Sequence, residues 1–291
     1  MAGKQVTELD ALPSFTDTSL LPVHNGAGLK KGTLTQLSNF LGTKFSNPNL
    51  LINPDFKINQ RGATSYEKQG YSVDRWKIWN VTVTSNANGG ITVKNDKYTD
   101  TGTFLQYLEN KPTGTFTVTL NVASVTGAVK FLWQDGSTLK TGVAISKGVN
   151  IYTFTASSLT WVGIQIASGA SIQLSYMKLE QGTVATSFIA PNMAAELTKC
   201  YRFYQRMKPH YSGYVAKFQT TYFPIPIKAQ TRTTGTIKVS DQQNSYNITG
   251  VLTTWSVGSD DYNKCPYIGF TTDLDGYARL NCIVEIDAEI Y

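Results

Sequence analysis

The segment 171–206 changes its hydrophobic period part-way along, and this change constrains the fold more than any other feature of the chain. Its first part alternates apolar and polar residues, at Ile172, Leu174 and Tyr176, which predicts a half-buried strand. Asn192 is a suitable N-cap, and the apolar residues after it recur at steps of three and four. They form the expected buried stripe of a helix: Met193, Leu197, Cys200, Tyr201 and Tyr204. The segment therefore predicts two β-regions joined by a connecting helix.

Short alternating segments, separated by glycine-containing turns, fill the region 47–190. The clearest runs are Phe116, Val118, Leu120 and Val122, and then Val162, Ile164 and Ile166. Regularly spaced short strands of this kind predict a β-sandwich of the jelly-roll type. The composition agrees, because 41% hydrophobic and 16% charged residues indicate an ordered chain. We expect Trp76 to lie in the core of this sandwich.

The region 208–291 predicts a second β-domain, again of the β-sandwich type. Its run Tyr222–Ile227 contains two prolines, which remove ladder donors, so the run is expected to be an edge strand or an extended packing segment. The final run alternates most regularly and predicts one long strand. Its expected apolar face consists of Ala278, Leu280, Cys282, Val284, Ile286, Ala288 and Ile290. Its expected polar face consists of Arg279, Asn281, Glu285, Asp287 and Glu289.

Residues 1–46 predict a small separate unit. Turn residues lie between two short extended pieces, and Thr33 and Gln36 have the spacing of a capping box that opens a helix. Such a unit is too small to bury a core by itself. We therefore expect its apolar side chains to pack on another surface: Leu20, Leu21, Val23, Leu34, Leu37 and Phe40. The alternative is a simple N-terminal arm of the first β-domain.

Several motifs resemble those of bacteriophage tail-fibre and tail-tip proteins. In that family a carbohydrate-binding-like jelly roll is followed by a helix, and the matching segments are 49–56, 60–62, 72–76, 177–188, 195–197, 200–206 and 287–290. The hairpin and helix expected within 20–42 resemble the N-terminal anchors of tail fibres and spikes. The resemblance implies a virion appendage that is anchored through the N-terminal unit, forms a homotrimer and contacts a receptor through its tip. It is specific over 49–206 and weaker beyond.

Composition argues against several other classes. The net charge of +6 comes from scattered Lys and Arg, whereas a nucleic-acid interface needs clustered ones. We expect neither a signal peptide nor membrane insertion, because no apolar run is long enough. The three widely spaced cysteines argue against a disulfide framework and suit folding in the cytoplasm of a bacterial host. Cys200 and Cys282 are expected in the core.

A catalytic or metal site is not expected. The chain has two histidines, His24 and His210, and neither lies near a nucleophile motif such as G-x-S-x-G. Asp273–Gly276 faintly resembles a calcium loop but lacks the later ligands, so a turn is the better interpretation. Aspartates are present, but the sequence does not pair them for glycoside hydrolysis. We therefore expect no cofactor, no metal and no enzyme activity.

Sugar binding is the function that these residues favour. Sugar rings stack their apolar C–H faces on flat aromatic rings, and polar neighbours bind the hydroxyl groups. Trp133 with Asp135, at a turn, is the candidate in the first β-domain. The candidates in the second are Trp255, Tyr262 and Tyr267. The competing interpretation is that these aromatic side chains pack in the core.

The expected parts are an anchor (1–46), a jelly roll (47–190), a connecting helix (191–207) and a C-terminal β-domain (208–291). The main hypothesis is a non-enzymatic, homotrimeric fibre subunit of a phage virion. It would bind a virion tail, baseplate or head protein through its N-terminus and attach, as a tail fibre, to a host cell-surface glycan. The alternative is a purely structural head-fibre, collar or baseplate decoration protein. A glycan depolymerase is a third hypothesis.

Overall fold

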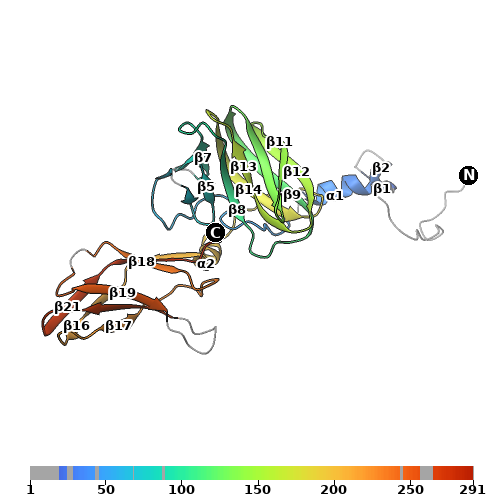
Figure 1. Cartoon of the computed structure of the whole chain (residues 1–291). Coiled ribbons are helices and arrows are strands. Elements are labelled where there is room, and N and C mark those ends of the chain that lie inside the picture. The colour runs from blue at the N-terminus through green and yellow to red at the C-terminus, as the bar shows by residue number, and fades with distance from the viewer. Residues whose placement is uncertain are drawn as a thin grey trace, which may run out of the picture.

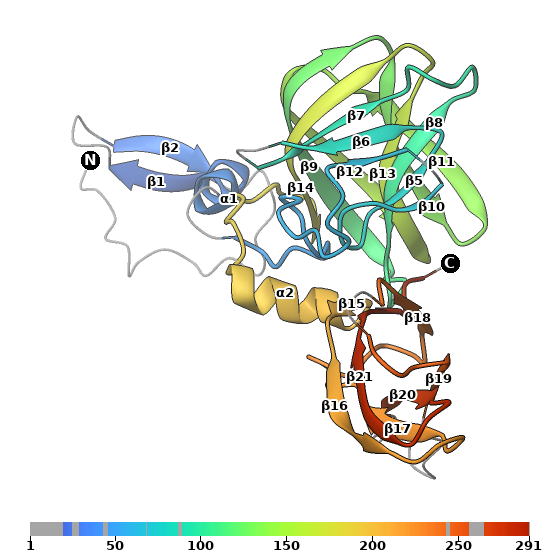
Figure 2. The same ribbon diagram turned by 90° about the vertical axis from the view of Figure 1, so that its left-hand side faces the viewer.

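The computed structural model describes residues 20–24, 29–42, 46–67, 69–86, 89–242, 245–255 and 265–290. Figure 1 shows an elongated, mainly β molecule with three successive parts. A hairpin with a helix lies at one end, a β-sandwich lies in the middle, and a smaller β-domain lies at the other end (Figures 1 and 2). The last described residues return to the junction between the sandwich and the C-terminal domain.

The N-terminal hairpin pairs β1 (Leu20–His24) with β2 (Leu29–Thr33), and α1 (Leu34–Gly42) follows directly. The predicted capping box is present. The Thr33 N–H donates to Gln36 Oε1 at 2.9 Å, and the Gln36 N–H donates to Thr33 Oγ1 at 3.1 Å. The helix has nine residues, too few to be stable without tertiary contacts.

Two six-stranded antiparallel sheets form the sandwich, which confirms the predicted fold class. Sheet A has the order β11–β10–β13–β8–β5–β4 and sheet B the order β12–β9–β14–β7–β6–β3. The strands of sheet A are β4 (Gly70–Tyr71), β5 (Lys77–Trp79), β8 (Gly102–Tyr107), β10 (Val129–Asp135), β11 (Thr138–Ala144) and β13 (Leu159–Ile166). Those of sheet B are β3 (Ser65–Tyr66), β6 (Thr82–Ser85), β7 (Ile91–Lys94), β9 (Gly114–Thr126), β12 (Gly148–Ala156) and β14 (Ser171–Gln181).

The alternating runs point into the sandwich, as predicted. Their buried side chains are Phe116, Val118, Leu120, Val122, Val162, Ile164 and Ile166. Trp76 is fully buried, and its indole N–H donates to the carbonyl of Asn53 at 2.9 Å. Its ring stacks on Phe104 with centroids 4.7 Å apart. One apolar core therefore fills the space between the two sheets.

Strand β14 departs from the simple alternation predicted for it. Leu174 is buried, but Tyr176 is only half-buried, and Met177 and Leu179 fill the core instead. The register with β9 shifts on both sides of Leu174. Such a bulge changes which side chains face inward. Tyr176 therefore stacks outside the core on Phe188, with ring centroids 4.0 Å apart.

Helix α2 (Met193–Tyr201) begins after Asn192, as predicted, and Asn192 Oδ1 accepts hydrogen bonds from the N–H groups of Ala194 and Ala195. It is shorter than the expected range 191–207, because residues 204–207 form strand β15 of the next domain. The backbone groups of residues 204–207 form their hydrogen bonds with β22, so they are not available to continue the helix.

The stripe predicted for this helix is also partly wrong. Met193 is 49% exposed, whereas Glu196 is buried beside Cys200. Glu196 faces inward because its carboxylate accepts the N–H of Asn53 at 2.7 Å. The hydrogen bond to the sandwich therefore places Glu196 on the buried side of the helix, where the apolar pattern does not predict it.

The described residues of the C-terminal domain form three small antiparallel sheets around one core, with the orders β15–β22–β18, β16–β21 and β17–β20–β19. The strands are β15 (Tyr204–Met207), β16 (His210–Val215), β17 (Thr221–Pro224), β18 (Thr236–Ser240), β19 (Gly250–Trp255), β20 (Pro266–Thr271), β21 (Gly276–Asn281) and β22 (Ile283–Asp287). Strand β17 lies at the edge of its sheet, as predicted for the run that contains Pro224 and Pro226, and it ends at Pro224.

The predicted single C-terminal strand is two strands in different sheets. Strand β21 pairs with β16, and β22 pairs with β15 and β18, with a break at Cys282. Cys200 and Cys282 are buried, as predicted, and burial raises the pKa of the Cys282 thiol to about 11. The placement of Glu289 on a polar outer face is wrong. It is 3% exposed, because Arg75 of the sandwich covers it.

Candidate ligand-binding surface

The motifs that carry the fibre resemblance meet at the junction between the two β-domains. Arg75 of the sandwich is buried, and its guanidinium group forms an ion pair with Glu289 near the C-terminus. The same group donates to the carbonyl of Tyr107 at 2.8 Å and lies 3.5 Å from the ring centroid of Phe203. Segments that are far apart in the sequence therefore share one buried contact.

A second arginine completes this junction. The guanidinium group of Arg61 lies 3.5 Å from the carboxylate of Glu289, 3.7 Å from that of Asp287, and over the ring of Tyr204 at 3.9 Å. Burial raises the pKa of the Asp74 and Glu289 carboxyl groups, and the hydrogen bonds and guanidinium groups around them oppose this rise. Opposite charges and aromatic rings cover one another here, so these motifs fasten the two domains together.

The motif 177–188 fastens the connector that leads to α2. The ammonium group of Lys178 is buried and lies 3.2 Å from the Glu180 carboxylate. It also donates to Ser46 Oγ and to the carbonyl of Thr186, both at 3.1 Å. Glu180 in turn accepts the N–H of Thr186 at 2.9 Å. The motif therefore holds the connector against the sandwich.

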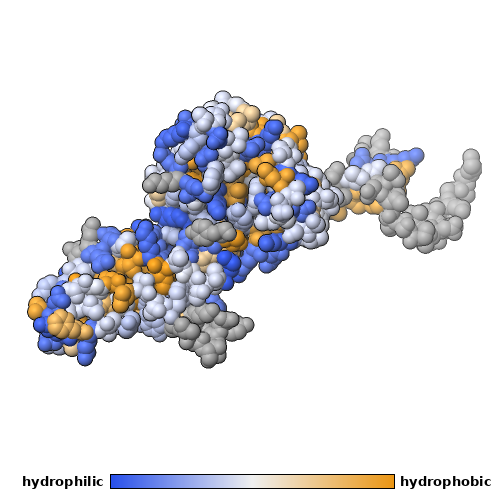
Figure 3. All heavy atoms as spheres, in the orientation of Figure 1, coloured by the Kyte–Doolittle hydropathy of each residue, from blue (hydrophilic) through white to orange (hydrophobic). Residues whose placement is uncertain are grey.

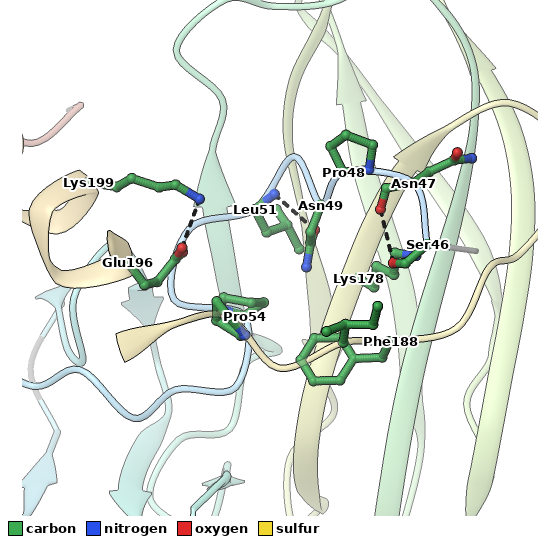
Figure 4. Close-up of a pocket in the computed structure, with 12 residues that line it drawn as sticks. Ser46, Asn47, Pro48, Asn49, Leu51, Pro54, Lys178, Phe188, Glu196 and Lys199 are labelled. Carbon is green, nitrogen blue, oxygen red and sulfur yellow. Dashed lines mark hydrogen bonds and ion pairs between the residues drawn. The ribbon is translucent and has the colours of Figure 1, made fainter. Parts of the chain in front are cut away.

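A cavity of about 340 Å³ opens beside this connector, between it, α2 and the segment 46–54 (Figure 4). Both lysines that line it are ion-paired, Lys178 with Glu180 and Lys199 with Glu196 at 2.8 Å. A ligand would have to compete with these internal partners. We therefore interpret the cavity as a gap between packed segments and not as a ligand site.

The predicted sugar contacts of the sandwich have partners within the protein. The ring centroid of Trp133 lies 4.6 Å from that of Phe154, at the edge of the core. Asp135 accepts the N–H groups of Ser158 at 2.8 Å and Ser157 at 2.9 Å. These hydrogen bonds, with that from Ser158 the largest, lower the pKa of Asp135. Sugar contact by Trp133 and Asp135 stays a prediction.

The predicted set in the C-terminal domain does not share a surface. Trp255 packs against the core, and its indole N–H donates to the carbonyl of Gly235 at 2.9 Å. Tyr267 lies opposite Thr254 in the sheet and therefore points to the face opposite to that of Trp255. Tyr262 lies outside the described residues. Their sugar contacts also stay predictions.

The outer face of sheet A carries aromatic residues, but one of them, Trp161, is buried. Trp161 is 7% exposed, packs with Leu105 and Leu132, and donates its indole N–H to Gln134 at 2.5 Å. Trp79, on the same face, is 48% exposed. Among the aromatic side chains of this face, Trp79 is the most exposed and Tyr107 is partly buried, so the face is a weak platform for a ligand.

Three tyrosines that are more than half exposed share the outer face of β16 and β21. The exposed fractions are 74% for Tyr214, 59% for Tyr277 and 64% for Tyr246. Tyr214 lies directly opposite Tyr277, and Ser212 lies opposite Arg279. Tyr246 bridges to Arg279 on the other side of β21. Paired residues of antiparallel strands point to the same face, so we call these five residues the tyrosine face.

Core packing forces this face outward. Ala278 and Leu280 alternate with its residues on β21 and are fully buried, so Tyr277 and Arg279 must point to solvent. The hydroxyl groups of Ser212 and Tyr277 are hydrogen-bonded, which restricts the Tyr277 ring. Beyond the tyrosines, Phe218 and Leu274 on the adjoining turns are 72% and 63% exposed. Figure 3 shows apolar atoms at this free end of the domain.

The tyrosine face is not predicted by the sequence pattern. The regular alternation of 278–290 places Arg279 outside and, extended by one step, would have placed Tyr277 there too. Nothing local indicates that β16 pairs with β21, because their paired residues Tyr214 and Tyr277 are far apart in the chain. The aromatic cluster is therefore a product of the pairing.

The predicted anchor residues lie at the opposite end of the molecule. Leu20, Leu37 and Phe40 are 55%, 41% and 58% exposed, and Leu34 is half-buried. Leu21 and Val23 belong to β1, and their side chains lie outside the described residues. The hairpin and helix thus expose apolar side chains, and their role as an anchor stays a prediction.

No protein-family model matches the chain, and no curated protein matches it. Among solved structures, the chain is similar to family 29 carbohydrate-binding modules. One such module shares 13% identity over 44% of this chain and 93% of its own length, with a TM-score of 0.30. A variant of a family 29 module complexed with mannohexaose shares 12% identity over 50% of this chain and 100% of its own length, with a TM-score of 0.33.

Within the described ranges, no group of three or more His, Cys, Asp or Glu side chains is arranged to hold a metal ion. Neither of the helices in the described part of the chain is long and apolar enough to cross a membrane.

Proposed function

We propose that the chain is a non-enzymatic attachment subunit of a bacteriophage virion fibre, and that its tyrosine face binds a host cell-surface glycan. The observation that carries the glycan part is the exposure of Tyr214, Tyr246 and Tyr277 on one face around Arg279. Exposed apolar surface that gathers on one face indicates a contact surface, and three exposed tyrosine rings lie together on this sheet face. The rings offer flat apolar faces to sugar C–H groups, and Ser212 and Arg279 offer hydrogen bonds to hydroxyl groups.

The virion part of the proposal rests on the motif resemblance and is supported by the arrangement of the molecule. The tyrosine face and the apolar hairpin and helix lie at opposite ends (Figure 1). A fibre tip needs this arrangement, with one end for the particle and one for the receptor. The protein would be made in the bacterial host cytoplasm and act on the virion.

A homotrimer would raise the overall avidity of the weak sugar contacts. Three linked copies convert later binding events into intramolecular ones, and this raises avidity by roughly 10²–10⁴ without any new contact. Light scattering on the full-length protein and on a variant without residues 1–45 tests this arrangement. We expect both proteins to be trimers, and this result would place the assembly contacts in the β-domains. Monomers of both would remove the trimeric fibre from the proposal.

Glycan binding is tested with an array of bacterial surface polysaccharides, probed with the full-length protein and with the double variant Tyr214→Ala/Tyr277→Ala. A well-packed aromatic contact is worth about 1–2 kcal/mol, so the double variant should bind at least about tenfold more weakly. The matched control is Trp79→Ala, which removes an exposed ring from the sandwich instead. Wild-type protein that binds no polysaccharide would refute the proposal, and equal binding by all three proteins would refute the assigned face.

The runner-up is a purely structural decoration protein of the head, collar or baseplate. The observation that favours it is that the motifs of the resemblance all serve the domain junction and the connector. A decoration protein would bind purified virion parts and no glycan, so the same array separates the two functions.

A further inference from the structure

A polar pocket of about 240 Å³ adjoins the tyrosine face. Its lining residues are Lys208, Pro209, His210, Asp241, Asn281, Cys282 and Ile283. His210 and Asn281 lie opposite each other in the β16–β21 pair, one step further along from Ser212 and Arg279 on the same face. The pocket is therefore continuous with the tyrosine face and lies at the end nearer the sandwich.

The pairing register sets the length of the combined surface. The pairs His210–Asn281, Ser212–Arg279 and Tyr214–Tyr277 succeed one another at steps of two residues. Four residues of strand separate the first pair from the last, which is about 13 Å at the strand rise of ~3.3 Å per residue. This length exceeds one sugar ring, so the surface suits a short chain of sugar units.

The pocket has the chemistry of a site for one sugar unit. Its lining includes the buried residues Pro209, Cys282 and Ile283, which suit the apolar face of a ring. It also includes the exposed residues Lys208 and Asp241, a donor and an acceptor for hydroxyl groups.

A short contact orders the side of the pocket that joins the tyrosine face. His210 Nδ1 lies 2.6 Å from Asn281 Oδ1, so each side chain orients the other. The pocket volume lies below the ~300 Å³ at which sites for drug-sized ligands begin. It therefore has room for one ring and not for a whole oligosaccharide.

We propose that the pocket holds the terminal unit of an oligosaccharide, and that the next units lie along Ser212, Arg279 and the three tyrosines. This rests on the proposed glycan binding and adds that the site recognises the end of a chain. A ring enters the pocket at the end of the strand pair, and the tyrosines then stack on the rings that follow. The ligand class is thus a chain end of a surface polysaccharide.

The test uses full-length protein and oligosaccharides of one to four units prepared from a polysaccharide that binds on the array, measured by titration calorimetry. For the wild type we expect affinity to rise with each added unit up to the third. His210→Ala should weaken binding of every length, the single unit included, by about tenfold. Tyr214→Ala/Tyr277→Ala should leave the single unit unchanged and abolish the gain with length. Circular dichroism and thermal unfolding show that each variant is folded.

Several outcomes separate the two proposals. Selective oxidation of the terminal sugar should abolish binding to the wild type. If binding survives that treatment, or if His210→Ala binds every length as the wild type does, the pocket is not the terminal site, while the tyrosine face remains. If the tyrosine variants change the mass in solution and leave sugar affinity unchanged, the face is an interface between copies. A wild type that binds no oligosaccharide overturns both proposals.

Discussion

Replacing Glu289 by alanine removes the carboxylate that Arg75 and Arg61 share at the domain junction. Glu289 is 3% exposed, and it also accepts the backbone N–H of Arg75 at 3.3 Å. Its loss leaves the buried Arg75 guanidinium without its charged acceptor, while the remaining partners of Arg75 are one carbonyl and one ring. The two domains would then meet across an uncompensated positive charge.

The expected cost follows from this burial. Removing one member of a buried ion pair costs about 3–5 kcal/mol, because the other member stays desolvated. The sandwich and the C-terminal domain, joined at this junction, together fall in the range of about 150–250 residues, for which 1 kcal/mol shifts the melting temperature by about 2–4 °C. We therefore expect Glu289→Ala to lower the melting temperature of the two coupled domains by roughly 6–20 °C.

Tryptophan fluorescence during thermal unfolding measures this effect, because four of the five tryptophans lie in the sandwich and Trp255 lies in the C-terminal domain. The matched control is Glu67→Ala, which breaks the ion pair between Glu67 and Lys97. The side chains of this pair are 51% exposed for Glu67 and 50% exposed for Lys97. An exposed pair is worth about 0–1 kcal/mol, so this control should unfold like the wild type. Equal melting temperatures for Glu289→Ala and the control would refute the structural role of the junction.

Three further predictions concern the sandwich. Trp133→Phe makes a partly buried ring smaller, so it should destabilise by about 0.5–3 kcal/mol and leave glycan binding intact; lost binding in a folded variant would place Trp133 in the site. Gly163→Ala should destabilise by about 1–3 kcal/mol in chemical denaturation, because its Cβ would lie 2.4 Å from the carbonyl of Phe104; a neutral result contradicts this packing. Hydrogen bonds from Ser158 and Ser157, with that from the Ser158 N–H the largest, hold the pKa of the Asp135 carboxyl below its ordinary value. The Asp135 carboxylate therefore contributes stability above its unfolded-state pKa, and this contribution is lost as the pH falls through the folded-state pKa. Denaturation of wild type and Asp135→Asn between about pH 5 and pH 2 should therefore show a steeper acid loss in the wild type, and parallel curves would contradict it.

For the candidate site the sequence proposes a ligand class, a sugar, which stays a prediction, and it does not indicate the position of the tyrosine face. Aromatic residues beside polar ones indicate sugar binding, but periodicity does not say which rings remain exposed. Trp133 and Trp255 pack against the two cores, whereas Tyr214 and Tyr277 stay open. Exposure depends on which strands cover one another, and that is decided by pairing between distant segments.

Local features of the chain determined the elements that need only near neighbours. The capping box at Thr33 and Gln36, the N-cap at Asn192 and the inward runs of β9 and β13 depend on contacts within a few residues or on strict alternation. The sequence by itself was therefore sufficient for a β-sandwich followed by a helix and a second β-domain.

Tertiary structure alone decided the rest. The bulge in β14, the break at Cys282 and the burial of Glu289 each arise where two distant segments compete for the same space or charge. The tyrosine face has the same origin, because it exists only once β16 pairs with β21. Such contacts join residues far apart in the chain. The local hydrophobic period does not determine which distant segment a strand pairs with or which distant residue a charged side chain contacts.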